Sequence, residues 1–109
     1  MSKKVDILGT TYTIKTDTEK NNPMLIGANG YIERYTKEII IELTNEGKNY
    51  DTSKNVGENN DRTLRHEIIH AFLYESGLLN YCENETLVDW IAIQMPKMVK
   101  AMTQTKCLK

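Results

Sequence analysis

The pattern of hydrophobic and polar positions predicts strands in the first half of the chain. Residues 4–15 carry β-branched and aromatic residues on both sides of Gly9-Thr10, which is typical of two short strands joined by a tight turn. A second strand pair is expected at residues 30–35 and 38–44, where the run Ile39-Ile40-Ile41 is the strongest strand signal of the chain. The pattern therefore predicts about four strands in two consecutive pairs.

The second half of the chain has the period of helices. Across residues 61–77, apolar side chains recur every three to four positions, which predicts a helix. Asn60 or Asp61 is the expected N-cap, and Gly77 is the expected C-terminal stop. A second helix is expected from Asn84, and Pro96 should kink or restart it. The tail from residue 104 has a weaker pattern and is expected to fray.

Polar segments separate these elements. Residues 16–28 and 45–60 are rich in turn-forming residues and are predicted to be loops, the second of them long and exposed. Because strands precede helices, we predict the α+β class, with a small, mainly antiparallel sheet of about four strands followed by two main helices. The length of 109 residues fits one ordinary domain, so residues 1–109 are expected to form a single domain.

Composition narrows the classes of function. The chain is 39% hydrophobic and 27% charged with a net charge of −1, and it has no basic stripe, so no nucleic-acid partner is expected. No apolar run approaches the roughly 20 residues of a membrane helix, and no secretory signal is visible, so we expect a cytoplasmic protein without a membrane partner. Cys82 and Cys107 are then expected to be reduced thiols. The oligomeric state is left open.

The candidate chemistry lies in the segment His66-Glu67-Ile68-Ile69-His70. Two histidines four positions apart on a helix lie on one face, one turn apart, and their imidazoles can both reach one Zn²⁺ ion. Glu67 follows the first histidine, where it can take a proton from a metal-bound water without binding the metal itself. The chain has only two histidines, and both fall in this pattern. The segment therefore predicts a catalytic zinc site.

A catalytic zinc ion usually takes a third protein ligand. Glu85 is the main candidate, because a chain reversal after Gly77 would bring the second helix back against the first. Asp89 lies one turn beyond Glu85, and we expect it to accept a hydrogen bond from a ligand histidine and fix its tautomer. Both residues have an alternative as ordinary surface carboxylates. The other candidates for the third ligand are Asp89 itself, Glu83, Glu75 and Cys82, of which the cysteine is expected to be a half-buried small residue.

These motifs resemble those of known peptidases. His66–His70 matches the HExxH signature of the zincin metallopeptidases, and Asn84–Asp89 resembles the NExxxD element of the thermolysin-like gluzincins. The resemblance implies that Glu85 is the third zinc ligand and that Asp89 supports a histidine. Residues 83–96, which end in Met-Pro, also look loosely like the corresponding helix of ImmA/IrrE-type peptidases. The layout is similar to small zincin-like proteins encoded by phages and prophages.

The resemblance covers about residues 61–96 and has departures. The gap from His70 to Glu85 is shorter than in thermolysin, so the chain resembles a minimal gluzincin core. Leu73 and Ser76 stand where the extended metzincin pattern has glycine and histidine, which excludes that pattern. Thr86, Leu87 and Val88 stand where the ImmA/IrrE pattern has small residues. The separate C-terminal domains of both families are absent from this sequence.

The expected function is zinc-dependent hydrolysis of a peptide bond in a peptide or protein substrate, with Glu67 as general base. The alternative is a non-catalytic, zinc-stabilised protein-binding module of phage or prophage origin. A peptide is expected to add to the edge of the sheet, with residues 38–44 as the candidate edge strand. The alternative for residues 38–44 is a strand in the core. Trp90 is expected in the core. An oxyanion donor cannot be chosen among the tyrosines, which are Tyr12, Tyr31, Tyr35, Tyr50, Tyr74 and Tyr81.

Overall fold

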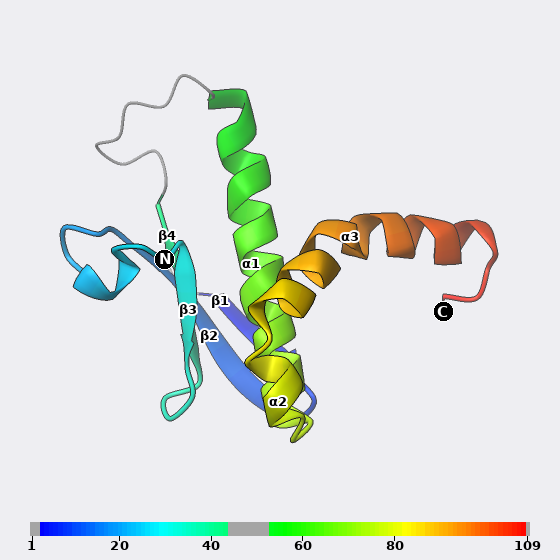
Figure 1. Cartoon of the computed structure of the whole chain (residues 1–109), viewed down its shortest axis with the longest axis horizontal. Helices are drawn as coiled ribbons and strands as arrows, with labels where there is room; N and C mark the ends of the chain where they lie inside the picture. Colours follow the sequence, from blue (N-terminus) through cyan, green and yellow to red (C-terminus); the bar gives the residue numbers. More distant parts are fainter. Residues whose placement is uncertain (1–2, 44–52, 109) are drawn as a thin grey trace.

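The computed structural model describes residues 3–43 and 53–108, in which a four-stranded sheet precedes the helices (Figure 1). The strands are β1 (Lys3–Ile7), β2 (Thr10–Asp17), β3 (Gly30–Glu33) and β4 (Glu38–Glu42), and they lie in the order β1-β2-β4-β3. Four strands followed by helices confirm the predicted α+β class. The first hairpin turns at residues 8 and 9, which both have positive φ, as tight hairpin turns require.

The sheet is mixed: two of its three pairings confirm the prediction of a mainly antiparallel sheet, and the third is parallel. β1 pairs with β2 and β3 with β4 in antiparallel fashion, but β2 and β4 are parallel. The segment 18–29, which includes a short 3-10 helix at Pro23–Leu25, carries the chain past the position of β4 before β3 begins. β3 therefore takes the outer edge, and the chain returns through β4 between β3 and β2.

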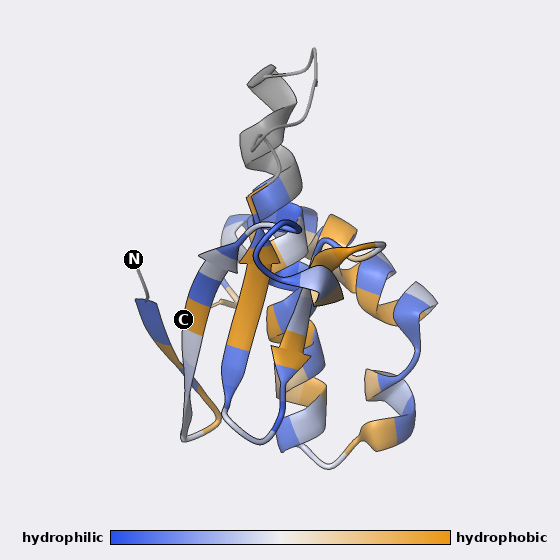
Figure 2. Cartoon of the chain, turned by 90° about the vertical axis from the view of Figure 1, so that its left-hand side faces the viewer, coloured by the Kyte–Doolittle hydropathy of each residue, from blue (hydrophilic) through white to orange (hydrophobic). Residues whose placement is uncertain are grey.

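The central position of β4 follows from its sequence. Ile39, Ile40 and Ile41 are all buried, so this strand has no solvent-facing side along the run. A continuous apolar run is typical of a strand that is covered on both faces. Figure 2 shows the hydrophobic segment of β4 between its neighbouring strands. Residues 38–44 are consequently not the edge strand predicted from the sequence, and the free edge next to the helices belongs to β3.

Helix α1 (Ser53–Glu75) packs against one face of the sheet, with α2 (Leu79–Cys82) and α3 (Glu85–Gln104) following it (Figure 1). α1 begins eight residues before the predicted Asp61, so residues 53–60 are helical and Asn60 is no N-cap. The physical reason is that a nucleated helix adds one hydrogen bond per further residue, which lets weak helix formers extend it. Residues 45–52 of the predicted loop lie outside the described part.

The end of α1 agrees with the sequence prediction. Gly77 has φ of +76°, and the N–H of Leu78 donates to the carbonyl of Leu73 at 3.0 Å. This is the hydrogen bond of a Schellman motif, in which a left-handed glycine terminates the helix. The chain reverses here, and Asn84 then caps α3 by accepting a hydrogen bond from the N–H of Leu87 at 3.0 Å. The reversal brings α3 back against α1.

Two apolar clusters hold the layers together. The larger one joins the sheet to α1 through the buried residues Ile7, Tyr12, Ile39, Ile41 and Ala71. The smaller one joins α1 to α3 through Ile69, Val88 and Ala92. α1 therefore packs against the sheet on one side and against α3 on the other, and these contacts hold the helix that carries the histidines in place. Among the described helices, none is both long and apolar enough to cross a membrane.

Pro96 lies inside α3 and neither ends nor restarts it. A proline has no N–H, so it cannot donate to the carbonyl of Ala92 four residues earlier. In this structure Arg65 on α1 supplies the missing donor, because its Nε donates to the Ala92 carbonyl at 2.7 Å. The proline thus leaves a helix carbonyl free, and α1 binds it. α3 ends at Gln104, and residues 105–107 close it with hydrogen bonds instead of fraying.

Replacing Arg65 with methionine is expected to lower the free energy of unfolding by about 1–3 kcal/mol, because the Ala92 carbonyl loses the donor that stands in for the N–H missing at Pro96. In a Pro96→Ala background the restored N–H satisfies that carbonyl, so the same replacement should cost clearly less. Urea unfolding of the four variants measures the coupling. Arg62→Met, which removes an exposed arginine from the same helix, is the matched control. Equal costs in the two backgrounds would contradict the proposed role of Pro96.

A polar cluster fixes the C-terminal end of α1 on the sheet. Glu75 accepts hydrogen bonds from the hydroxyl of Tyr12 at 2.6 Å, from Nζ of Lys37 at 2.9 Å and from the hydroxyl of Thr10 at 3.2 Å. The Tyr12 hydroxyl is the largest of the causes that lower the pKa of Glu75. Conversely, burial raises the pKa of Tyr12, and the Glu75 carboxylate raises it further. Glu75 therefore has a structural role.

The variant Tyr12→Phe is expected to lose about 1–2 kcal/mol of stability near neutral pH, because it removes a hydrogen bond to a carboxylate. A lowered carboxyl pKa stabilises the fold above the ordinary value of 4.5, and this contribution is lost as the pH falls through the lowered pKa. The difference between wild type and variant should therefore shrink in acid. Urea unfolding across pH tests this. Tyr35→Phe, on a side chain that is almost fully exposed, should change nothing.

Candidate metal centre

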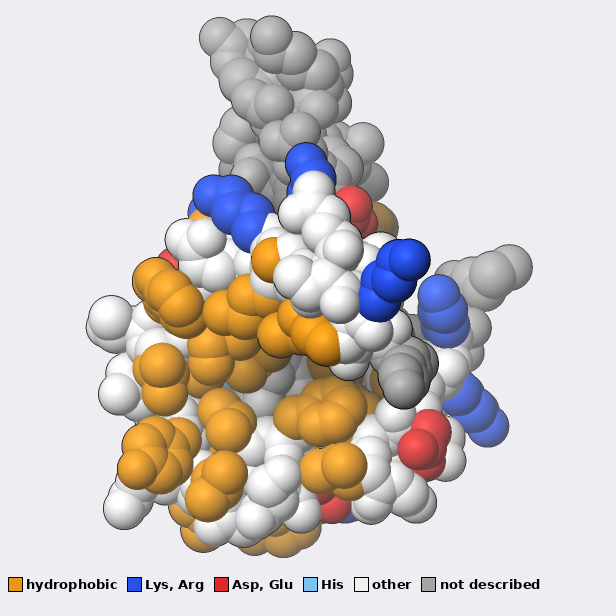
Figure 3. All heavy atoms as spheres, turned by 90° about the vertical axis from the view of Figure 1, so that its right-hand side faces the viewer, with side chains coloured by type: hydrophobic (Ala, Val, Ile, Leu, Met, Phe, Trp, Pro, Cys, Tyr) orange, Lys and Arg blue, Asp and Glu red, His pale blue; other side chains and the backbone are white. Residues whose placement is uncertain are grey.

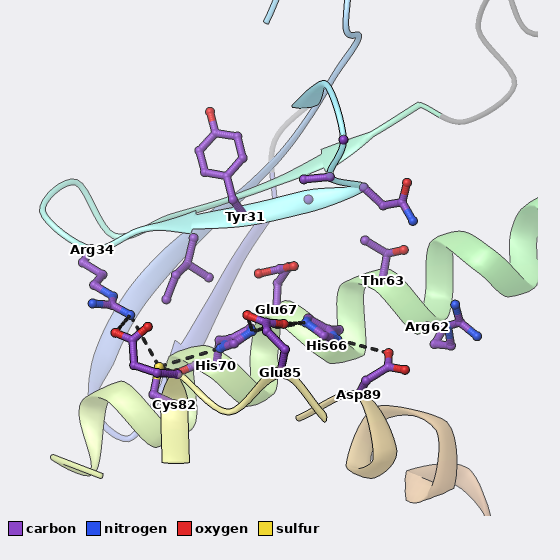
Figure 4. A pocket seen from close by; sticks show the side chains of 16 residues that line it. Tyr31, Arg34, Arg62, Thr63, His66, Glu67, His70, Cys82, Glu85 and Asp89 are labelled. Atoms are coloured by element: carbon purple, nitrogen blue, oxygen red, sulfur yellow. Dashed lines mark hydrogen bonds and ion pairs between the residues drawn. The ribbon is translucent and has the colours of Figure 1, made fainter. Parts of the chain in front are cut away.

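Helix α1 brings the two histidines together on one face. His66 and His70 are one turn apart, their ring centroids are 4.8 Å apart, and their Nε2 atoms are 3.1 Å apart. His70 is nearly buried, whereas His66 is partly exposed. Figure 4 shows both rings pointing from α1 toward the start of α3. The helical spacing that the sequence predicted thus aims two imidazole nitrogens at one point.

Glu85, in the first turn of α3, reaches the same point from the opposite side. Its carboxylate lies 2.9 Å from Nε2 of His66 and 3.2 Å from Nε2 of His70. The three donor groups offer ligand atoms within 4.8 Å of one another. Bonds of about 2.0–2.1 Å in a tetrahedral zinc site separate neighbouring ligand atoms by about 3.3 Å. Two neutral nitrogens and one carboxylate oxygen at these distances therefore fit a zinc ion.

Asp89 lies at the other nitrogen of His66. Its Oδ1 is 3.3 Å from Nδ1 of His66, so it is outside the group of three donors. A carboxylate at Nδ1 accepts the hydrogen of that nitrogen and leaves Nε2 free to bind a metal. The structure thus brings Asp89 next to His66, and its role in fixing the tautomer of a ligand histidine stays a prediction.

Cys82 lies at Nδ1 of His70 in the same way that Asp89 lies at Nδ1 of His66. This contact was not predicted from the sequence. Its sulfur is 3.7 Å from Nδ1 of His70, and its thiol donates to the His70 carbonyl at 3.4 Å. The thiol is fully buried, and burial raises its pKa, which the guanidinium of Arg34 opposes. A sulfur that donates to the carbonyl can accept from Nδ1, which again leaves Nε2 as the free nitrogen. No sequence period points to this contact, because Cys82 lies in the link between helices.

The two remaining candidates for the third ligand lie outside the donor group, although Glu83 lines the same cleft. Glu75 binds Tyr12 and Lys37 at the far end of α1, and Glu83 lies 3.3 Å from Arg34. Neither belongs to the donor group of the described residues. The interpretation of Cys82 as a half-buried residue is also corrected, because it has no exposed surface.

Glu67 lies beside the donor group and faces the sheet. It is 6% exposed, and burial raises its pKa to about 7, although the neighbouring His66 lowers it and Glu85 raises it further. Figure 4 shows its carboxylate between α1 and β3. Gly30 lets β3 approach this closely, because a Cβ there would lie 2.8 Å from the Ile40 carbonyl and 3.4 Å from Cγ of Glu67. The arrangement provides a desolvated carboxyl group within a turn of both histidines.

A cleft of about 540 Å³ opens over these groups, between β3 on one side and the two main helices on the other (Figure 4). Of the tyrosines, only Tyr31 is among its described lining residues, but its ring points away from the histidines and its hydroxyl accepts from Asn22 at 2.9 Å. Tyr50 lies outside the described residues. Two arginines that the sequence analysis did not consider, Arg34 and Arg62, also line the cleft.

Comparison with protein-family models, with curated proteins and with solved structures gives no match. The chemistry of the site must therefore be inferred from its own donor atoms. Among the described residues, these donors are two imidazoles and a carboxylate, with a buried carboxyl group beside them. Three protein ligands plus one open position are typical of catalytic zinc, whereas structural zinc sites use four protein ligands.

Proposed function

We propose that this chain is a zinc-dependent metallohydrolase, most specifically a peptidase with a minimal gluzincin-like core. The observation that carries the proposal is the convergence of His66, His70 and Glu85, with donor atoms 2.9–3.3 Å apart, on a cleft that also contains Glu67. A zinc ion held by these three residues supplies an acidified water and polarises a carbonyl group. The intact Glu67 favours catalysis, because a structural zinc site does not need it.

Glu67 is the proton carrier in this proposal. Its carboxyl group is buried and its pKa is raised to about 7, so it can accept and release a proton near neutral pH. It takes the proton of the attacking water and later gives it to the leaving amine. Asp89 and Cys82 would hold the two imidazoles so that Nε2 of each stays free to bind the metal.

The edge of β3 supports a peptide as the substrate. The N–H of Glu42 donates to the carbonyl of Asn29 at 2.8 Å, and bonded pairs alternate along an antiparallel ladder. The backbone groups of Gly30 and Ile32 therefore point away from β4, toward the free edge, and both residues line the cleft. An extended peptide can pair with these groups and lie over the donor group. In this proposal the peptide therefore pairs with β3 and not with residues 38–44.

The proposal is tested with the purified chain in zinc-free and zinc-loaded form. We expect one Zn²⁺ per chain by calorimetric titration and cleavage of an unbiased peptide library by the zinc-loaded form alone, read by mass spectrometry. Tight zinc binding without any cleavage would overturn the hydrolase proposal. Failure to bind zinc would overturn the metal site as well.

An exposed apolar surface favours a second candidate, a zinc-stabilised module that binds a partner protein. Figure 3 shows hydrophobic side chains gathered on the face from which the C-terminal half of α3 projects. Large apolar residues are exposed on all three helices and in the link between α1 and α2, namely Phe72, Leu78, Leu79, Trp90, Ile93, Val99 and Met102. Surfaces of this kind mark interaction sites in many proteins. Zinc binding without cleavage, together with an unchanged biological effect of Glu67→Gln, would favour this candidate.

A further inference from the structure

A second hollow, of about 520 Å³, adjoins the candidate metal centre on the α3 side. It is lined by His66, Glu85, Thr86, Asp89, Trp90 and Ile93. Three of these residues, His66, Glu85 and Asp89, also line the main cleft, so the two spaces meet at the donor group. A substrate bound over the metal centre would therefore have one end next to this hollow.

The outer wall of the hollow is apolar, although it faces solvent. Trp90 is 53% exposed and Ile93 is 37% exposed, which corrects the expectation that Trp90 is in the core. Both project from the side of α3 opposite to Val88 and Ala92, which are the residues that pack on α1. The core therefore does not use this tryptophan. An indole beside a reactive site offers a large and rigid apolar surface that is still available for a ligand.

The inner wall determines which ligand fits. The carboxylates of Glu85 and Asp89 line it, but each lies close to a ring nitrogen of His66, at 2.9 and 3.3 Å. Their negative charge repels an acidic ligand group. The exposed lining is mostly apolar. The hollow therefore disfavours an acidic side chain and offers its largest contact surface to an apolar one.

We propose that this hollow is a specificity subsite, which receives an aromatic or branched aliphatic side chain next to the bond that is cleaved. Trp90 and Ile93 form its contact surface, and Thr86, on the preceding turn of α3, also lines it. The inference rests on the proposed function, because the metal centre anchors the substrate beside the hollow. Burial of one large apolar side chain against these residues is expected to raise affinity about tenfold or more.

The test uses zinc-binding hydroxamates as probes, because the hydroxamate group anchors each probe at the metal. Acetohydroxamic acid carries only a methyl group, 3-phenylpropanohydroxamic acid adds an aromatic ring, and a succinic monohydroxamate adds a carboxylate. Calorimetry on the zinc-loaded chain should show the aromatic probe binding at least tenfold more tightly than acetohydroxamic acid and the acidic probe binding no better. Trp90 is the only tryptophan of the chain, so its fluorescence reports directly whether the aromatic ring reaches the hollow.

Two variants locate the preference. Trp90→Ala and Ile93→Ser should each remove most of the advantage of the aromatic probe and leave the affinity for acetohydroxamic acid unchanged. Val99→Ser is the matched control, because Val99 is 41% exposed on the same helix but outside the hollow. Exposed positions tolerate such changes, and circular dichroism verifies that each variant is folded.

The possible outcomes separate the subsite from the function on which it rests. Equal affinities of the aromatic and methyl probes for the wild type would overturn the subsite and leave the metal centre intact. A preference that persists in both Trp90→Ala and Ile93→Ser would place the ring elsewhere and also overturn it. Absence of zinc binding, and of binding by every hydroxamate, would overturn the proposed function and the subsite together.

Discussion

Replacing Glu67 with glutamine is expected to reduce peptide hydrolysis about 1,000-fold while zinc still binds. General acid–base catalysis by a positioned side chain contributes about 100- to 10,000-fold, and a glutamine cannot carry the proton. Glu67 is not one of the three donor groups, so the affinity for zinc should stay within a few-fold of the wild type. The measurements are the rate of cleavage of a library-derived peptide and a calorimetric zinc titration of the same preparation.

Glutamine has the size of glutamate and no charge, so it fits the buried position without a new charged group. Asp61→Asn is the matched control, because it removes a carboxylate from an exposed position of the same helix. This control should hydrolyse peptide at the wild-type rate. If Glu67→Gln retained full activity, Glu67 would not be the proton carrier, and the proposed mechanism would fail.

Replacing Glu85 with glutamine is expected to weaken zinc binding more than 100-fold. Loss of a supporting hydrogen bond around a metal costs about 10- to 100-fold, and loss of a ligand should cost more than that. The carboxylate of Glu85 lies against Nε2 of both histidines, so its loss leaves only two donors on the metal-facing side. Competition with a chelator of known zinc affinity measures the change.

The chain provides a matched control two positions away. Glu83 has the same side chain, but it pairs with Arg34 at 3.3 Å and stays outside the donor group. Glu83→Gln should therefore leave zinc affinity unchanged. Asp89→Asn should have an intermediate effect, about 10- to 100-fold, because it acts through His66. If Glu83→Gln weakened zinc binding as much as Glu85→Gln, the third ligand would have been assigned to the wrong residue.

Much of the candidate site could be predicted because its geometry is local. The four-residue spacing of His66 and His70 fixes their common face as soon as the segment is helical. The glycine at 77 encodes the reversal of the chain, and Asn84 encodes the start of the next helix, so Glu85 is brought back within about ten residues. The α+β class follows equally from the order of periodic segments.

The rest depends on contacts between distant segments. The parallel pairing of β2 with β4 joins residues that are more than twenty positions apart, and no local period distinguishes it from an antiparallel pairing. The contact of Cys82 with His70 and the exposure of Trp90 also arise only when the helices are placed. Trp90 was expected in the core, although its position on α3 is about half a turn away from Val88 and Ala92.

The hydrogen bond between Arg65 and Ala92 determines which part of α3 lies against α1. In an uninterrupted helix every interior carbonyl is occupied, so a partner helix that slides by one turn loses no specific bond. Pro96 makes one carbonyl different from all its neighbours. Arg65 is adjacent to His66 in the sequence, so its hydrogen bond to this carbonyl favours the axial alignment in which Glu85 and Asp89 face the imidazole of His66. One proline thus contributes, some ten residues away, to the distance between Glu85 and His66.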